Sequence, residues 1–359
     1  MTHIRTRHIA IAFAAFIVVA APALAQKPGL QPSDLSRLRS VGDVQISPDG
    51  KTVVYAVSNN DRPGRPYSQV WMLDVASGRS RRLGGERDTA SEPHFSPDGR
   101  RLAYIGRIDA GPGLIVAQAD GSSPQLIAPV TGTNHPLPSS GDRLSWSPDG
   151  TRIAFISATP GPEADANGDP MVIARYLYKP TASEGETRAN DNRRIHIFVA
   201  DVGSKQVRQL TDGNYYEHSI DWSPKGDEIL FVSNRGPDPD RFFNYDVFSV
   251  NVMSGTVRRL TDSRSAEYYP RWSPDGRLVA FSGTKRPLTS SETTMEDTKV
   301  WVMASDGSAR REVGGSIDNR QGAPEWSDGA ASVRHDAGAR SRAAAAPAGR
   351  RRRSAASCR

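Results

Sequence analysis

The sequence has almost no cysteine. Cys358 is the single cysteine among 359 residues. An intrachain disulfide, a cysteine-based metal site and a C-x-x-C redox motif are therefore excluded. A protein of this length can be stable without disulfides even when it is exported, because its core is large enough.

Long apolar runs are also missing. The longest, residues 9–21, has about 13 residues, whereas a transmembrane helix needs about 20. Two arginines precede this run and small residues follow it, an order typical of a secretory signal peptide. We predict a signal peptide over residues 1–25, cleaved between Ala25 and Gln26. The mature chain should then be periplasmic or secreted, with no membrane span.

The body of the chain lacks an excess of positive charge, although the formal net charge is +6. Residues 26–329 hold 36 basic and 39 acidic side chains, a net charge of −3. The signal segment contributes +2 and residues 330–359 contribute +7. We therefore expect no nucleic-acid partner for the folded part.

Residues 330–359 lack leucine, isoleucine and aromatic residues, and contain eleven alanines and eight arginines. No hydrophobic face can form there, so we predict a disordered tail. Shifted-frame translation of GC-rich DNA yields such a composition, and we treat a frame shift as a hypothesis for its origin.

The body is built from a repeat of about 50 residues. Ser-Pro-Asp-Gly occurs four times, a related Ser-Pro-Lys-Gly occurs once, and a damaged copy, Trp-Ser-Asp-Gly, ends at Gly329. The intact copies are Ser47–Gly50, Ser96–Gly99, Ser147–Gly150, Ser223–Gly226 and Ser273–Gly276. Proline, aspartate and glycine in this order favour a tight hairpin turn.

Short β-rich runs flank each copy in the same order, giving four strands per repeat. Such a repeat is typical of a β-propeller blade. We predict an all-β propeller over residues 44–329, with five complete blades and the start of a sixth. A helical lead-in should occupy residues 26–43, and a Gly- and Pro-rich insertion of about residues 158–194 should lie in the third blade.

The start of the propeller resembles that of S9-family serine peptidases, the prolyl oligopeptidase and acylaminoacyl-peptidase group. The resemblance rests on Asp34–Asp43, the first Ser-Pro-Asp-Gly copy, and residues 195–224, and it covers roughly residues 30–329. TolB-like periplasmic propellers share the Trp-Ser-Pro-Asp-Gly pattern. The lead-in and the third-blade insertion favour the peptidases.

The family places its Ser-Asp-His triad in a hydrolase domain, with the serine in a Gly-x-Ser-x-Gly elbow. No Gly-x-Ser-x-Gly occurs in these 359 residues. No catalytic residue is therefore assigned, and the chain alone is expected to be inactive. The resemblance implies a truncated, substrate-gating propeller whose partners are a peptide substrate or a hydrolase domain missing from this chain. The alternative is a TolB-like module that binds an envelope protein, and a weaker third is a lactonase-type enzyme.

Three residues of the third-blade insertion are candidate substrate contacts: Arg175, Tyr176 and Glu184. An insertion of this kind could face the peptide, and arginine binds carboxylates in a bidentate manner. The alternative is that the insertion is a solvated surface loop without a ligand. Asp165–Asp169 has part of a calcium-loop pattern, but Pro170 stands where that loop needs glycine. We predict no metal site and no cofactor.

Overall fold

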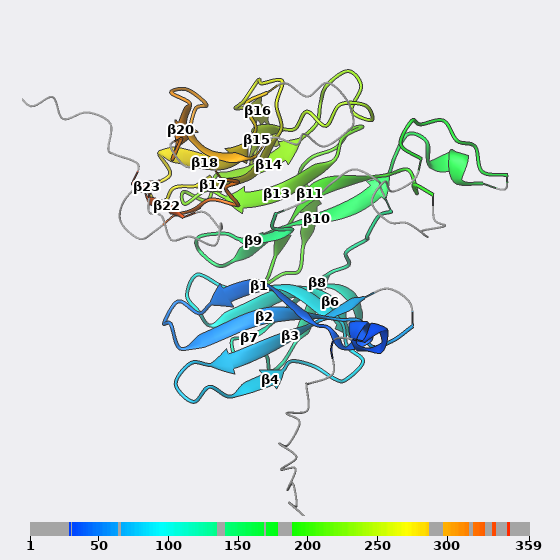
Figure 1. The fold of residues 1–359 in the computed structure, drawn as a ribbon, viewed down its shortest axis with the longest axis vertical. Coiled ribbons are helices and arrows are strands. Elements are labelled where there is room, and N and C mark those ends of the chain that lie inside the picture. Colours follow the sequence, from blue (N-terminus) through cyan, green and yellow to red (C-terminus); the bar gives the residue numbers. More distant parts are fainter. Residues whose placement is uncertain are drawn as a thin grey trace, which may run out of the picture.

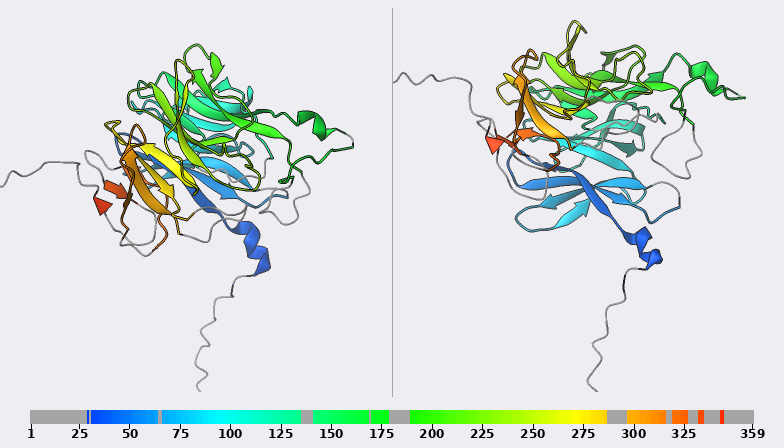
Figure 2. Two further views of the ribbon diagram at one scale, coloured as in Figure 1. Left: turned by 90° about the horizontal axis from the view of Figure 1, so that it is seen from above. Right: turned by 45° about the horizontal axis from the view of Figure 1, so that its top comes forward.

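The structure is a computed structural model that describes residues 29, 31–63, 66–134, 141–168, 170–178, 189–286, 297–315, 319–326, 332–334 and 343–344. Within these residues the chain forms five four-stranded antiparallel sheets, the blades of a β-propeller (Figures 1 and 2). In each blade the strands follow one another from the innermost to the outermost. The predicted all-β propeller with five complete blades is confirmed.

The five blades have the following strands. Blade 1 contains β1 (Ser40–Ile46), β2 (Thr52–Asn59), β3 (Tyr67–Asp74) and β4 (Ser80–Arg82). Blade 2 contains β5 (Ala90–Phe95), β6 (Arg101–Ile108), β7 (Gly111–Gln118) and β8 (Gln125–Ala128). Blade 3 contains β9 (Leu144–Trp146), β10 (Arg152–Pro160), β11 (Arg193–Asp201) and β12 (Val207–Gln209). Blade 4 contains β13 (Glu217–Trp222), β14 (Glu228–Ser233), β15 (Asp246–Asn251) and β16 (Val257–Arg259). Blade 5 contains β17 (Glu267–Trp272), β18 (Leu278–Gly283), β19 (Lys299–Ala304) and β20 (Arg311–Val313).

The sixth unit is a sheet of three short strands, β21 (Glu325–Trp326), β22 (Ser332–Arg334) and β23 (Ala343–Ala344). Trp326 packs against the core of blade 5, and its indole N–H donates to the carbonyl of Arg271 at 3.1 Å. The last two strands lie in the Ala- and Arg-rich segment, where the sequence pattern predicted none. The other residues of that segment lie outside the described residues.

Two short 3-10 helices complete the structure. η1 (Pro32–Arg37) lies within the predicted lead-in, and η2 (Ala164–Asn167) lies within the third-blade insertion. Both extend from the body of the propeller (Figure 2). The first strand begins at Ser40, before the predicted boundary at residue 44.

The Ser-Pro-Asp-Gly turns owe their shape to one serine and one aspartate. In blade 3 the Ser147 hydroxyl donates to Asp149 at 2.5 Å and accepts the amide of Arg152 at 2.9 Å. Gly150 closes the turn with a φ of +66°, a conformation that favours glycine. These bonds hold the pKa of Asp149 below its usual value, with the Ser147 hydroxyl as the main cause.

Contacts between consecutive blades repeat around the ring. A Cβ placed on Gly99 would lie 3.3 Å from Pro48 of the preceding blade, and one on Gly150 would lie 3.7 Å from Pro97. The aromatic residue before each turn packs at the same junctions. Trp146, Trp222 and Trp272 are all buried.

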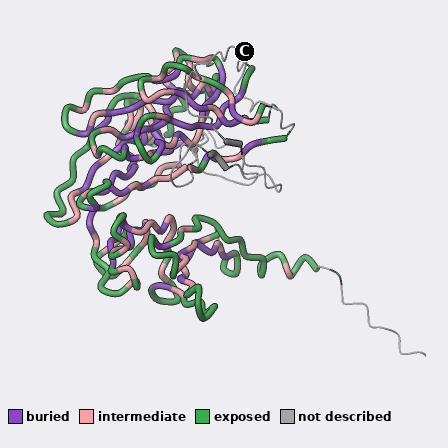
Figure 3. Tube along the Cα trace, turned by 90° about the vertical axis from the view of Figure 1, so that its left-hand side faces the viewer, coloured by how far each residue is buried: buried purple, intermediate pink, exposed green. Residues whose placement is uncertain are grey.

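The inner face of blade 1 is different. Ile46 occupies the position of the buried tryptophans but is 64% exposed, and Val41 and Val44 are also exposed. A Cβ on Gly50 would meet nothing within 4 Å. Figure 3 shows this exposure running from η1 into β1. Blade 1 thus lacks the packing that the other junctions receive.

Candidate functional site

The two faces of the propeller differ in their loops. Strands alternate in direction, so the serine-containing turns and the turns between third and fourth strands all lie on one face. Those connections are short and uniform. The other face carries the long connections, which include residues 129–143, 161–192, 234–245 and 284–298. Figure 1 shows the insertion with η2 projecting from the body. Since binding residues concentrate on variable loops, this loop-bearing face is the candidate functional face.

Arg175 of the insertion is held by blade 4. Its Nε donates to Asp240 Oδ2 at 3.1 Å, its Nη2 contacts Oδ1 of the same carboxylate, and its Nη1 donates to the Tyr216 hydroxyl at 2.6 Å. The side chains of Arg175 and Asp240 are 10% and 12% exposed. The predicted substrate contact is therefore engaged in an internal bidentate ion pair.

A second arginine holds the start of the insertion. Arg194 is 1% exposed and contacts Glu163 and Asn214 at 2.5 Å. Burying a guanidinium is costly unless all its donors are paired, and here they bind a carboxylate, an amide oxygen and backbone carbonyls. The two arginines together fix the insertion on the loop-bearing face.

The other two predicted contacts have different outcomes. Tyr176 is 61% exposed, and the guanidinium of Arg241 lies 5.3 Å from its ring centroid. Glu184 lies outside the described residues, as do Ala25 and Gln26 of the predicted cleavage site. The structure therefore brings Arg175 and Tyr176 to one face without assigning them a ligand.

A buried glutamate occupies the junction between blades 3 and 4. Glu217 is fully buried and lies 2.7 Å from His196 Nδ1, 3.0 Å from Arg235 and 3.2 Å from the Thr211 hydroxyl. The guanidinium of Arg235 also covers the ring of Tyr215 at 4.5 Å. The carboxylate is thus fully paired and closed off.

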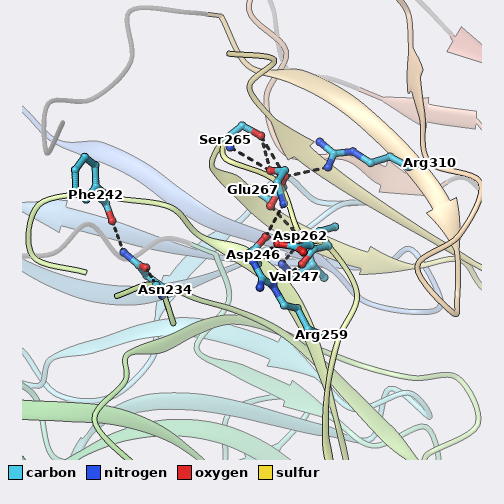
Figure 4. Close-up of polar contacts among 12 residues, drawn as sticks. Asn234, Phe242, Asp246, Val247, Arg259, Asp262, Ser265, Glu267 and Arg310 are labelled. Atoms are coloured by element: carbon cyan, nitrogen blue, oxygen red, sulfur yellow. Dashed lines mark hydrogen bonds and ion pairs between the residues drawn. The ribbon is translucent and has the colours of Figure 1, made fainter. Parts of the chain in front are cut away.

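The junction between blades 4 and 5 has an equivalent glutamate, Glu267 (Figure 4). It accepts from Thr261 at 3.0 Å and from Ser263, and it pairs with Arg310 at 3.2 Å. Burial raises the pKa of Glu267 to about 7, against the lowering effect of Ser263 and Arg310. Close by, Asp246 pairs with Arg259 at 2.6 Å.

A third polar cluster lies where the innermost strands meet. Arg271 of β17 contacts Asp142, which lies just before β9, at 2.5 Å, so the inner edges of blades 3 and 5 lie close together. Glu92 accepts from the Arg143 amide at 3.0 Å and pairs with its guanidinium at 3.2 Å. Burial raises the pKa of Glu92 to about 7 and that of Asp221 to about 6. The centre therefore presents alternating, mutually paired charges.

Sequence reasoning missed this cluster, although the repeat contained its signal. A β-bulge with positive φ stands four residues before the serine of the turn in blades 1, 2, 4 and 5. The residues are Asp43, Glu92, Ser219 and Tyr269. A bulge re-aims neighbouring side chains, and Glu92 is the one of these four residues that belongs to the cluster.

Within the described residues, no group of three or more histidine, cysteine, aspartate or glutamate side chains could hold a metal ion. No helix in that part of the chain is long and apolar enough to cross a membrane. What the three clusters provide is charge pairing and hydrogen bonding, which suit the binding or exclusion of polar ligands.

Comparison with known proteins relates the chain to peptidases. It is 26% identical over 224 residues to the uncharacterized peptidase YuxL of Bacillus subtilis, and 26% identical over 226 residues to dipeptidyl-peptidase 5 of Porphyromonas endodontalis. These matches cover 60% and 58% of the chain but 33% and 31% of the relatives. The chain thus spans about a third of the length of the curated relatives it matches. No family model matches it.

Solved structures share the fold. The acylaminoacyl peptidase of Pyrococcus horikoshii has a TM-score of 0.55 at 14% identity, over 84% of this chain and 43% of that one. The propeller domain of the trilobed protease of Pyrococcus furiosus has 0.52 at 14%, over 84% and 78%. A putative TolB of Agrobacterium tumefaciens has 0.51 at 20%, over 76% and 80%. The homologues are S9-type peptidases, and the chain is consistent with the N-terminal propeller of such an enzyme.

Proposed function

We propose that this chain is the substrate-gating propeller of an exported S9-type serine peptidase, acting with a hydrolase domain that supplies the triad. The observation that carries the proposal is the similarity to two curated peptidases over the propeller repeat. The absence of a Gly-x-Ser-x-Gly elbow from these 359 residues means that the chain is expected to have no peptidase activity of its own.

The charged residues where the innermost strands meet support gating. A hydrolase domain would cover the loop-bearing face, and a peptide would pass the paired charges at the centre, such as Arg271 and Asp142. In this proposal the propeller admits an extended peptide to the hydrolase and excludes a folded protein, which is wider. In this proposal Tyr176 and Glu184 contact the substrate, and Arg175 positions the insertion that carries them.

Export is part of the same proposal. The basic, apolar and small residues before Gln26 support secretion across a membrane and a periplasmic or extracellular location. Edman sequencing of the chain purified from its native host tests this. A mature protein that begins at Gln26 supports export, and one that begins at Met1 contradicts it.

Gating can be tested by reconstitution. The hydrolase domain of an S9-type peptidase, expressed as a separate chain, is assayed on a short peptidyl anilide and on an unfolded protein substrate, with and without this propeller. We expect the propeller to reduce cleavage of the protein much more than that of the anilide. Equal effects on both substrates would refute gating, and anilide cleavage by the propeller alone would refute its lack of catalysis.

A second candidate is a TolB-like module that binds an envelope protein. The likeness to the Agrobacterium TolB, over 80% of that chain, favours it at the level of fold. The two functions differ in their partner. A propeller that leaves the hydrolase unaffected but captures a defined envelope protein in a pull-down would favour the TolB-like role.

A further inference from the structure

The junctions between blades 3 and 4 and between blades 4 and 5 are built from the same elements. Residues 211–217 and 261–267 align without a gap, from a threonine to a fully buried glutamate. In both, the threonine hydroxyl accepts a backbone amide of the third strand, that of Ile197 or of Val247, and donates to the glutamate. One junction can therefore serve as an internal reference for the other.

The arginine that pairs with the glutamate comes from a different position of the repeat at each junction. At the first junction it is Arg235, which lies over the rings of Phe231 and Phe248 at 5.6 and 4.9 Å. At the second it is Arg310, which lies over the equivalent rings of Phe281 and Trp301 at 5.2 and 4.6 Å.

Lys285 occupies the position in blade 5 that Arg235 occupies in blade 4. Its Nζ pairs with Glu312 at 2.8 Å and not with the junction glutamate. The aromatic residue at the first junction is missing from the second as well. Tyr215, which packs on Arg235, corresponds to Ser265, and the buried Tyr216 corresponds to Ala266.

A pocket of about 470 Å³ is present at this second junction, bounded by Ser265, Lys285, Trp301, Arg310 and Glu312. This volume is within the range of small-molecule sites. The pocket thus lies where the first junction has a tyrosine ring.

The pocket is rich in cations. Arg264 lies exposed at its rim and makes no ion pair among the described residues, in contrast to Lys285 and Arg310. In the part of the chain that the structure describes, Arg310 Nε is a buried donor without a hydrogen-bond partner, as is Arg235 Nε at the first junction. The second junction differs from the first in the open space beside its guanidinium, not in this donor. Figure 4 shows Arg310, Glu267 and Ser265 converging at this place.

We propose that this pocket binds a carboxylate group of a peptide, with Arg264 and Arg310 as its donors and Trp301 as the wall for the adjoining apolar part. Guanidinium groups form charge-assisted hydrogen bonds that match carboxylate geometry. The carboxylate belongs either to the chain terminus or to an acidic side chain. This binding site requires no hydrolase domain, so it stands apart from the gating role.

The test uses the full chain and ligand-observed NMR titration. N-acetyl-alanyl-alanine and its C-terminal amide are compared, as are N-acetylglutamate α-amide and N-acetylglutamine α-amide. We expect at least one acid to bind roughly tenfold more tightly than its amide, as the loss of one charged hydrogen bond predicts. If N-acetyl-alanyl-alanine binds more tightly than its amide, the pocket recognises a C-terminal carboxylate. If N-acetylglutamate α-amide binds more tightly than the glutamine compound, the pocket recognises an acidic side chain.

Two variants and a control locate the site. Arg264→Ala should weaken acid binding roughly tenfold and leave amide binding unchanged, since its side chain is exposed and makes no ion pair with another described residue. Arg100→Ala, an equally exposed arginine on the opposite face, should bind as the wild type does.

Ser265→Tyr introduces the residue of the first junction and should abolish binding, with a melting temperature recorded to confirm folding. Equal affinity for acids and amides, wild-type binding by Arg264→Ala, or no binding by the wild type would each overturn the proposal.

Discussion

Substitution of Arg175 tests whether this residue holds the insertion or serves only a ligand. Arg175 and Asp240 are about nine-tenths buried and share two hydrogen bonds, and Arg175 makes a third with Tyr216. In Arg175→Ala the Asp240 carboxylate keeps only the Leu177 amide, at 3.5 Å. Removing one partner of a buried ion pair costs about 3–5 kcal/mol, because the other charge stays buried and unpaired.

The assay is urea denaturation followed by tryptophan fluorescence. We expect Arg175→Ala to lower the free energy of unfolding by about 3–5 kcal/mol. Arg241→Ala is the matched control, because its ion pair with Asp238 is 62% and 45% exposed and should contribute at most about 1 kcal/mol. Asp240→Asn completes a double-mutant cycle, in which the double variant should lose clearly less stability than the sum of the two single variants.

A loss below about 1 kcal/mol, equal to that of Arg241→Ala, would refute the structural role of Arg175. If the single variant does not fold at all, Arg175→Lys keeps the charge but loses the bidentate geometry and should show a smaller, measurable loss. Unchanged stability together with weaker substrate binding would return Arg175 to the list of substrate contacts.

Two further predictions concern Glu92 and Ile46. Burial raises the folded-state pKa of Glu92 from 4.5 to about 7, so its protonated form stabilises the fold fully below pH 4.5 and this contribution is lost as the pH rises to 7. Relative to Glu92→Gln, the wild type should therefore lose up to about 3 kcal/mol over that range in urea titrations, and a constant difference would contradict the assignment. Ile46→Lys should improve solubility without loss of melting temperature because Ile46 is exposed, whereas Trp146→Lys at the buried equivalent position should unfold the chain. If Ile46→Lys is no more soluble than the wild type, the exposed face of blade 1 does not limit solubility.

The fold could be predicted because the repeat constrains local chemistry. The Ser-Pro-Asp-Gly turn depends on hydrogen bonds between residues at most five positions apart, such as those of Ser147. The local sequence is therefore enough to predict the turn. The tryptophans before the turns recur at the same place in the repeat, and their burial is equally regular. Periodicity predicts strand order and burial well, since each blade repeats the same environment.

The site could not be predicted to the same extent, because its contacts join residues that are distant in sequence. Arg175 and Asp240 are 65 positions apart, and Arg271 and Asp142 are 129 apart. A candidate arginine can be recognised as a carboxylate binder, but whether its partner is a substrate or an internal aspartate depends on the packing of two blades. The sequence identifies Arg175 as a residue that can bind a carboxylate, but only the tertiary structure shows that this carboxylate is Asp240.

The Ser-Pro-Lys-Gly copy of blade 4 shows which contacts the five turns have in common. Lys225 replaces the aspartate that accepts the serine hydroxyl in the other turns, and Asp227, two positions later, accepts it instead at 2.7 Å. The Ser223 oxygen still receives the amide of Glu228 at 3.2 Å, and Gly226 keeps a φ of +76°. The feature that the five turns share is therefore a buried serine whose hydroxyl donates to a nearby aspartate and accepts a backbone amide, whichever residue stands third in the tetrapeptide. The same reasoning explains the two junction glutamates. Both junctions have a paired, buried carboxylate, but they differ in the arginine and the aromatic residues around it. Because of that difference, the second junction has a pocket where the first has a tyrosine ring.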